Sequence, residues 1–393
     1  YLDHYEPRPF NILDEYTNGY GARTVFTLNF ALLKKMANLD FGGEYYRDGY
    51  NWKTIENLYE DNNGQGSLEG NLLSENKEIR RNLNAFATIT LPLTEMLKAQ
   101  VGINFNTTQY NFKDQFNLGA DNKSASRQFD PILAPNLNLL YRFNQNINAY
   151  FNISRGFNYP TIEETLTPDG LINAALGPEK GYNYEVGSEV FLLNKRLYFK
   201  VAAYVLSIED LLVAKRVGED EYIGRNAGKT EHKGIEFQSS YLQPLANTIY
   251  IAPFLNVEIN DHKFIDFVDG ENDFSGNPLT GVAALKINGG INFGFDNFKL
   301  NTNFLHLGEV PMNDANTLYA DSYTVLNLKT SYEKQISKAL KIGFNFGLNN
   351  FTDKKYASSI LINASSFGNS EPRFYYPGAP RNWFAGVIVK YGI

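Results

Sequence analysis

Arginine and tyrosine residues recur in segments of the sequence that are rich in Gly, Pro, Asp and Asn. A guanidinium group can donate two parallel hydrogen bonds to a carboxylate or catecholate, and a tyrosine supplies a rigid ring and a hydroxyl. Side chains of these two types favour the binding of an anionic, oxygen-rich small molecule. The candidate ligand-binding residues are Arg155, Tyr159, Arg216, Tyr222, Arg225, Arg373, Tyr375 and Tyr376.

Residues that could carry enzyme chemistry form no recognisable set. The four histidines are scattered at His4, His232, His262 and His306, and neither an H-E-x-x-H nor a G-x-S-x-G motif occurs. A Ser/His/Asp triad or a pair of catalytic aspartates cannot be assembled from the sequence. We therefore expect no catalytic residues, and we expect that the protein is not an enzyme.

Three further motifs favour structural over functional interpretations. Residues 224–230 resemble a P-loop, but they are one residue short between the glycines and lie between predicted strands. Asp266, Asp269, Glu271 and Asp273 could bind Ca²⁺ through their carboxylates, although a solvated acidic loop fits better. The pair at 289–290 is two glycines, which predicts strand bending or close packing. We expect neither a metal site nor a cofactor.

The elements that must position these residues are long strands of alternating polarity. Residues 340, 342, 344, 346 and 348 are all apolar, whereas the residues between them are Lys, Gly or Asn. The same alternation predicts about fifteen strands. Their approximate ranges are 21–33, 38–53, 78–91, 99–106, 133–143, 147–155, 182–193, 196–208, 231–242, 248–260, 281–295, 298–308, 322–333, 340–351 and 380–393, with a small extra hairpin within 209–229 and a loop at 1–20.

The connections between these strands alternate strictly between short and long. The short ones fall near residues 34–37, 92–96, 144–146, 194–195, 243–247, 296–297 and 335–338, and the long ones carry the Gly, Pro, Asp and Asn residues. Strands of 10–14 residues exceed the usual length of about 5–6 in globular proteins. This pattern predicts an all-β transmembrane antiparallel β-barrel, with short turns facing the periplasm and long loops facing outside.

The last strand shows how such a segment fits a membrane. Trp383 and Tyr391 lie on its apolar face, eight residues apart. At about 3.3 Å per residue and a tilt near 40°, these rings are separated by roughly 20 Å along the membrane normal. The strand therefore fits an outer membrane with an aromatic ring at each headgroup level.

The composition is compatible with such a barrel. The chain has 393 residues, a hydrophobic content of 43% that excludes disorder, and no run of the ~18 apolar residues that a transmembrane helix needs. It has no cysteine, so disulfides and thiolate metal sites are excluded. The net charge of −7 and the lack of a basic tract argue against a nucleic-acid partner.

Short motifs over residues 150–393 resemble those of a known family in the same order. They are Ser154-Arg-Gly-Phe157, Pro178-Glu-Lys-Gly-Tyr-Asn-Tyr-Glu-Val-Gly187, Tyr204 with Ile208-Glu-Asp210, Asn226-Ala-Gly228 with Lys233-Gly-Ile-Glu-Phe237, Leu348-Asn-Asn-Phe-Thr-Asp-Lys-Lys-Tyr356 and Tyr376-Pro-Gly-Ala-Pro-Arg381. Together they resemble the barrel of TonB-dependent outer-membrane transporters, and most of all the ferric-siderophore receptors. Residues 1–149 fit this family only by their strand pattern.

The resemblance implies a 22-stranded barrel with an N-terminal plug, located in the outer membrane of a Gram-negative bacterium and driven by the TonB energy-coupling complex. Residues 1–393 would then be the C-terminal portion of the barrel domain, with about fifteen strands, without the plug or the TonB-contacting segment. The implied partners are a ferric siderophore or a similar small chelate, the TonB complex through the missing N-terminal part, and membrane lipid.

Other functions stay open at this point. The ligand could be cobalamin, another metal chelate or an oligosaccharide, although only two tryptophans are present to form sugar platforms. A passive porin, a barrel enzyme and a soluble β-protein are further alternatives. Each candidate tyrosine or arginine could instead be an aromatic residue at the membrane interface or a solvated loop charge.

Overall fold

The computed structural model describes residues 2–32, 34–165, 167, 172–173, 175–218, 221–226, 228–269, 271–364, 366 and 372–392. These residues form mainly antiparallel β-strands, and the largest sheet contains 18 of them. The chain divides into two compact units. Unit 1 comprises residues 1–138, 154–181 and 210–227, and unit 2 comprises residues 139–153, 182–209 and 228–393. Among the described residues, no helix has the length and apolar character needed to cross a membrane.

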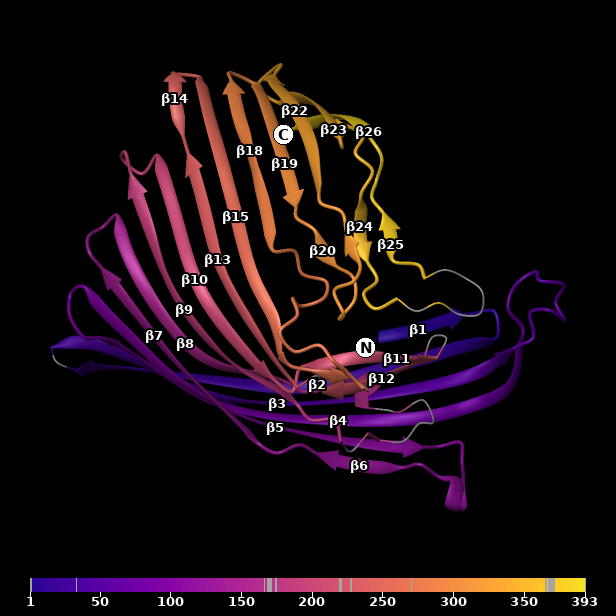
Figure 1. Cartoon of the computed structure of the whole chain (residues 1–393). Helices are drawn as coiled ribbons and strands as arrows, with labels where there is room; N and C mark the ends of the chain where they lie inside the picture. Colours follow the sequence, from indigo (N-terminus) through magenta and orange to yellow (C-terminus); the bar gives the residue numbers. More distant parts are fainter. Residues whose placement is uncertain are drawn as a thin grey trace. The chain divides into compact units, whose positions relative to one another are not determined.

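Unit 1 contains the first strands of the chain and a hairpin from later in the sequence (Figure 1). Its elements are β1 (Leu2–Pro7), β2 (Asn11–Leu32), β3 (Lys35–Asn57), β4 (Glu69–Pro92), β5 (Leu97–Asp114), the 3₁₀ turn η1 (Gly119–Asp121), β6 (Ala125–Gln128), α1 (Ile162–Thr165), β11 (Leu212–Gly218) and β12 (Glu221–Asn226). Strands β1 to β5 each pair with the next one along the chain, and β11 pairs with β12. Strands β7 (Ile132–Arg142), β8 (Ile147–Asn158) and β9 (Glu179–Leu192) contribute residues to both units.

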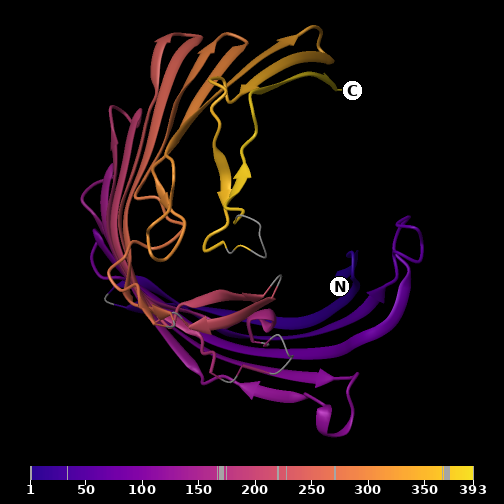
Figure 2. The same ribbon diagram turned by 45° about the vertical axis from the view of Figure 1, so that its right-hand side comes forward.

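Unit 2 contains the remaining strands. They are β10 (Leu197–Glu209), β13 (Lys229–Tyr241), β14 (Gln243–Ala246), β15 (Ile249–Asp266), β16 (Val268–Asp269), β17 (Asn272–Asp273), β18 (Leu285–Phe295), β19 (Phe298–Leu307), β20 (Val310–Pro311), β21 (Tyr319–Ala320), β22 (Tyr323–Gln335), β23 (Leu340–Asn349), β24 (Ala357–Ile360), β25 (Tyr375–Pro377) and β26 (Asn382–Tyr391). The long strands pair in the order β10, β13, β15, β18, β19, β22, β23, β26. Figure 2 shows the β24–β25 hairpin standing apart from β22, β23 and β26.

The predicted strand pattern is confirmed. Of the 18 strands in the main sheet, β1, β6 and β14 are short additions of four to six residues. The other fifteen have 10 to 24 residues each, and each of them overlaps one of the fifteen predicted ranges. The short connections lie where they were predicted, and the extra hairpin within 209–229 is β11–β12.

The predicted loop at residues 1–20 is wrong. β1 occupies Leu2–Pro7, and β2 begins at Asn11 and pairs with β3 as far as Glu56. Likewise, the connection between the predicted strands 38–53 and 78–91 is shorter than predicted and comprises residues 58–68, because β3 extends to Asn57 and β4 begins at Glu69. In these extensions polar residues occupy both faces, so the sequence resembles a loop, while cross-strand pairing still satisfies the backbone hydrogen bonds.

The apolar faces of the unit 1 strands form a band of limited height. On β4 this face presents Leu83, Ala85, Ala87, Ile89 and Leu91 in alternation, and Leu83 is 48% exposed. Those five positions span about 20 Å along the membrane normal at the rise and tilt of barrel strands. The next residue on this face is Arg81, which lies opposite Arg47 of β3. Two facing guanidinium groups mark the edge of the apolar band on the long-loop side.

The last strand of unit 2 has the predicted faces. Trp383 and Tyr391 are 69% and 72% exposed, and the valines at 387 and 389 between them are exposed as well. The Trp383 ring stacks on Phe346 of the neighbouring β23, with ring centroids 6.3 Å apart. Exposed apolar side chains flanked by aromatic rings are what a strand facing lipid requires.

Candidate functional site

All the predicted ligand-binding residues lie on the long-loop side of the strands. Arg155, Tyr159 and the β11–β12 residues belong to unit 1, whereas Arg373, Tyr375 and Tyr376 belong to unit 2. The candidates therefore fall into two sets, one in each unit.

Arg155 lies near the end of β8, on the same face as Ile153. Its Nη1 donates a hydrogen bond to the carbonyl oxygen of Leu133 at 3.0 Å. The guanidinium group is half-buried and holds the β7 backbone. This placement favours a structural contribution by Arg155.

Tyr159 follows β8 and is enclosed by other aromatic rings. Its ring centroid lies 5.1 Å from that of Phe129 and 5.5 Å from that of Phe157. Its hydroxyl lies 3.4 Å from the carbonyl oxygen of Asn106 and 3.3 Å from that of Asp130, and donates to them. Burial, reinforced by Asp130, raises the pKa of Tyr159 to about 12. The hydroxyl therefore keeps its proton at neutral pH, and Tyr159 lines a pocket that is described below.

The β11–β12 hairpin carries three of the candidates. Arg216 and Tyr222 are direct register partners, and Arg225 lies opposite Val213. The side chains of Arg216 and Tyr222 lie outside the part of the chain whose side chains the structure describes, and Arg225 is half-buried.

The P-loop-like segment at residues 224–230 includes the last residues of β12 and the first residues of β13. A Cβ on Gly224 would lie 2.4 Å from the carbonyl oxygen of Glu164, so this glycine allows a close backbone approach. Gly228 has a φ of +61°, a conformation that glycine adopts without strain. The backbone conformation and packing therefore explain why glycine occupies both positions, in agreement with the structural interpretation of this motif.

The β24–β25 hairpin presents the most accessible candidates. Tyr375 and Tyr376 are 54% and 58% exposed, and Arg373 two residues earlier is exposed as well. Tyr375 pairs with Ile360 and Tyr376 with Ser359, so the backbone of the hairpin fixes both tyrosines. The result is a short, rigid element that offers two rings and one guanidinium group.

The acidic cluster spans the end of β15, where Asp266 lies, and the small β16–β17 hairpin. Asp269 pairs with Asn272, and Asp273 accepts a hydrogen bond from the Ser275 amide at 2.9 Å. Within the described residues, no group of three or more His, Cys, Asp or Glu side chains could hold a metal ion.

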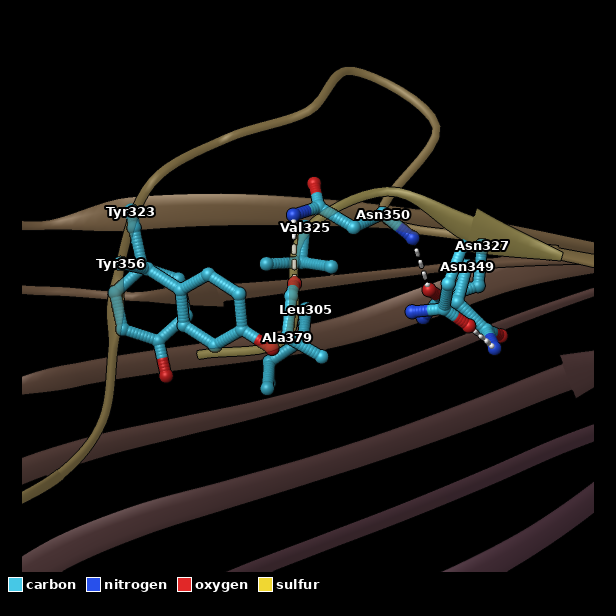
Figure 3. A pocket seen from close by; sticks show the side chains of 9 residues that line it. Leu305, Tyr323, Val325, Asn327, Asn349, Asn350, Tyr356 and Ala379 are labelled. Atoms are coloured by element: carbon cyan, nitrogen blue, oxygen red, sulfur yellow. Dashed lines mark hydrogen bonds between the residues drawn. The ribbon is translucent and has the colours of Figure 1, made fainter. Parts of the chain in front are cut away.

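One pocket of unit 2 is built around Asn350, which has a φ of +48° (Figure 3). Its side-chain amide donates to the carbonyl oxygens of Lys354 and Ala379, at 2.8 and 3.1 Å. The rings of Tyr323 and Tyr356 lie beside each other, with centroids 4.8 Å apart. This arrangement gives the motif at residues 348–356 a structural role. Through Asn350, the start of the long loop after β23 is hydrogen-bonded to the end of the same loop at Ala379.

The sequence interpretation missed a polar row that crosses four strands of unit 1. Asp48 of β3, Arg80 of β4, Tyr110 of β5 and Arg127 of β6 are successive register partners. Arg80 donates to Asp48 through Nε and Nη2, at 3.1 and 2.6 Å. The Arg127 guanidinium lies over the Phe129 ring at 4.5 Å. The row therefore combines paired charges with aromatic surface on the polar face of the sheet.

This row borders a pocket of about 440 Å³, which Tyr159 also lines. The lining is mainly polar and includes Glu44, Asn82, Asn84 and Asn106. Its volume lies within the range of small-molecule sites, about 300–1,000 Å³. Tyr159 is thus a predicted residue that lies at a cavity of ligand size.

A second missed cluster pairs two of the histidines. The rings of His232 and His262 lie 4.7 Å apart between centroids, on adjacent strands. Tyr204 hydrogen-bonds the Nε2 of His262 at 3.1 Å, and Thr230 hydrogen-bonds the Nε2 of His232 at 3.0 Å. The two residues are 30 positions apart in the sequence, so only the strand register reveals their proximity.

A third missed feature joins three long loops of unit 2 through Asp314. Its carboxylate accepts hydrogen bonds from the Thr280 hydroxyl and from the Asn363 side-chain amide, the latter at 3.0 Å. The Asp314 carbonyl oxygen accepts from the Asn277 side chain at 2.8 Å. The same loops share a small apolar cluster of Ala283, Val310, Met312 and Ala320, packed against Leu307, Ile360 and Phe374. Through Ile360 and Phe374 this cluster supports the hairpin that carries Tyr375 and Tyr376.

Asp114, the last residue of β5, stabilises the loop that follows this strand through hydrogen bonds. Its carboxylate accepts the backbone N–H groups of Phe116, Asn117 and Lys123 at 3.0, 2.9 and 3.1 Å. Burial alone would raise the pKa of Asp114, but these hydrogen bonds lower it to about 2. Because the folded pKa lies below the ordinary value, the stabilisation is present above pH ~4 and is lost as the pH falls towards 2.

We expect Asp114→Asn to accelerate hydrogen exchange of these three amides by about tenfold at neutral pH, since an amide is a weaker acceptor than a carboxylate. Hydrogen exchange read by mass spectrometry checks this. Asp121→Asn, at an exposed position of the same loop, is the matched control. Equal exchange in both variants would show that the Asp114 carboxylate does not hold the loop.

Comparison with known protein families gives a match over most of the chain. The model of the family described as TonB dependent receptor-like, beta-barrel matches residues 2–351. Among curated proteins, the metal-pseudopaline receptor CntO of Pseudomonas aeruginosa is 22% identical over 317 residues, which cover 77% of this chain and 40% of CntO.

Solved structures show the same fold. The unliganded ferric citrate transporter FecA superposes with a TM-score of 0.76 and 15% identity, over 98% of this chain and 57% of FecA. The ferric-catecholate import receptor Fiu from E. coli K12 superposes with a TM-score of 0.70 and 15% identity, over 97% of this chain and 55% of Fiu. The copper transporter OprC superposes with a TM-score of 0.71 and 15% identity, over 97% of this chain and 59% of OprC. The chain thus spans less than two thirds of each of these proteins.

The family match and the shared fold assign the long strands to an outer-membrane β-barrel, in which the apolar faces contact lipid and the polar faces line the interior. The family consists of receptors and transporters and not of enzymes. The chain therefore belongs to the TonB-dependent receptor-like β-barrel family of the outer membrane.

Proposed function

We propose that this chain forms part of an importer that takes up a ferric siderophore, or a similar small iron chelate, with energy from the TonB complex. The observation that carries the proposal is the β24–β25 hairpin, which presents Tyr375, Tyr376 and Arg373 on the long-loop side of a barrel of this family. In the proposed orientation the long loops face the outside and capture the ligand. The protein would then carry out no chemistry on it.

The chemistry of these side chains suits a chelate of iron. The oxygens of citrate or catecholate are anionic, and a guanidinium group can pair with two of them at once. Tyrosine rings add apolar contact area with little loss of conformational entropy. The names of two similar proteins are consistent with this class of ligand, since FecA is a ferric citrate transporter and Fiu a ferric-catecholate import receptor.

We also propose that residues 1–393 are the C-terminal portion of the barrel domain. The chain covers 40% of CntO and 57% of FecA, which leaves room in a complete receptor for further strands and for a plug. The contact with the TonB complex would belong to that other part. A plug in that other part would favour active import over passive diffusion through a porin.

A second candidate ligand is a chelate of a metal other than iron. The names of CntO, a metal-pseudopaline receptor, and OprC, a copper transporter, favour it. Uptake assays with radioactive iron, zinc, nickel and copper, each offered with the same set of chelators, distinguish the two candidates.

We expect the double variant Tyr375→Ala/Tyr376→Ala to weaken chelate binding by at least about tenfold, because exposed aromatic anchors carry much of the energy of such interfaces. Equilibrium binding of iron-loaded citrate, catecholate and hydroxamate chelates to the complete receptor in detergent measures this. Tyr332→Ala, at an exposed tyrosine near the short-turn end of β22, is the control. Unchanged affinity for a bound chelate in the double variant would remove the hairpin from the site.

A further inference from the structure

The polar face of unit 1 contains a buried carboxyl group without a complete set of partners. Glu78 of β4 is only 3% exposed, and within the described residues its Oε2 has no hydrogen-bond partner. Its register partners are Tyr50 of β3 and Phe112 of β5, so aromatic residues flank it on both sides. Buried polar atoms nearly always have partners, and an unpaired carboxylate oxygen indicates that one is missing.

Glu78 lines a pocket of about 290 Å³ in unit 1. Its other ionisable side chains come from four strands: Glu15 of β2, Asp48 and Tyr50 of β3, Arg80 of β4 and Tyr110 of β5. The hydroxyl side chains of Thr17 and Thr161 also line it. The pocket lies beyond the facing pair Arg81 and Arg47, which marks the edge of the apolar band. It is therefore outside the membrane-spanning segments.

The charges around the pocket do not balance. Asp48 and Arg80 neutralise each other through two hydrogen bonds at 3.1 and 2.6 Å. Glu15 has a contact of 3.1 Å with His4 of β1, which is charged only when protonated. Tyr110 donates its hydroxyl to the carbonyl oxygen of Pro160 at 2.6 Å. The acidic groups of the pocket outside the Asp48–Arg80 pair are therefore Glu15 and Glu78, and either one in its ionised form attracts a cation.

We propose that this pocket binds a protonated primary amine, with Glu78 as the counter-ion and the rings of Tyr50 and Tyr110 alongside. An ammonium group donates three hydrogen bonds, which Oε2 of Glu78 and the carboxylate of Glu15 can accept. Aromatic faces add to the attraction for a cation. An anionic ligand would instead meet the carboxylate of Glu15, the carboxyl group of Glu78 and a guanidinium that Asp48 already occupies.

Burial raises the pKa of Glu78 to about 8, which supplies a signature of binding. At pH 7 the empty pocket holds a neutral carboxylic acid. When the ammonium group enters, the carboxyl group gives its proton to the solvent, and the product is a carboxylate paired with the ammonium. Binding at pH 7 therefore releases a proton, and the carbonyl stretch of the protonated carboxyl disappears.

Infrared difference spectroscopy on the complete receptor in detergent tests the proposal, with 1,4-diaminobutane as the probe. We expect the probe to abolish the carbonyl band of a protonated carboxyl in the parent protein. In Glu78→Gln that band should be absent from the start, and the affinity for the amine should fall at least about tenfold. Glu60→Gln, at an exposed loop position, should behave like the parent.

The amine could belong to a small molecule or to a lysine of the complete polypeptide. If the carbonyl band is present in the parent before the diamine is added and is lost afterwards, the amine comes from a small molecule. If the carbonyl band is already absent before the addition, and mass spectrometry identifies a carbodiimide cross-link between Glu78 and a lysine, the amine is that lysine. A band that is present, unaffected by the probe and accompanied by no cross-link overturns the proposal. Because the readout is a proton on Glu78, failure here leaves the proposed import of an iron chelate untouched.

Discussion

Gly290→Val is expected to prevent the barrel strands from folding correctly. A Cβ at Gly290 would lie 2.0 Å from the carbonyl oxygen of Thr302 on β19 and 2.9 Å from the ring of Phe254 on β15. The first of these atoms belongs to the backbone, so the strands would have to separate, and valine adds two methyl groups to the clash. We expect a loss of at least about 3 kcal/mol in folding free energy.

The measurement is the fraction of the complete receptor that becomes heat-modifiable and resistant to protease in the outer membrane. Gly156→Val is the matched control, because a Cβ at Gly156 of β8 has no atom within 4 Å. Normal assembly of the Gly290 variant would contradict the strand register. The packing at Gly289 and Gly290 agrees with the prediction of close packing at this glycine pair.

Asp314→Ala is expected to release three long loops of unit 2 at once. The substitution leaves the Thr280 hydroxyl and the Asn363 amide without their acceptor, and each such lost hydrogen bond costs about 1–3 kcal/mol. Hydrogen exchange in these loops should therefore accelerate by about 10- to 100-fold. The hairpin with Tyr375 and Tyr376 should also lose order, since it packs against the same cluster.

Hydrogen exchange of peptides covering residues 277–281, 312–318 and 361–363 measures this effect. Asp321→Ala, an exposed aspartate in the loop between β19 and β22, serves as the comparison. If hydrogen exchange in the Asp314 variant is faster only in the loop that contains residue 314, the three loops are not coupled through this residue.

The strand framework could be predicted from the sequence because each strand repeats a local rule. The alternation of apolar and polar residues predicts the ends of β23 and β26 to within a few residues. The short connections are then the few residues left between consecutive strands. The extensions of β2, β3 and β4 could not be predicted, since beyond the apolar band both faces carry polar residues. There the backbone pairing, and not the side-chain pattern, maintains the strand.

The candidate site could be predicted only where its residues are close in sequence. Tyr375, Tyr376 and Arg373 lie on one hairpin, as do Arg216 and Tyr222. The row through Asp48, Arg80 and Tyr110, the His232–His262 pair and the Asp314 network each join residues 30 or more positions apart. Their proximity depends on strand register and loop packing, which a single sequence does not encode in any local pattern.

The central claim is that this chain belongs to an energised importer of an iron chelate. The most direct test is uptake of radioactive iron by cells of the source bacterium, offered as citrate, catecholate and hydroxamate chelates, with and without the receptor gene. We predict that deletion abolishes uptake of at least one chelate, that the intact gene restores it, and that removal of TonB abolishes it again. Unchanged uptake of every chelate after deletion, or restored uptake that does not need TonB, would contradict the account.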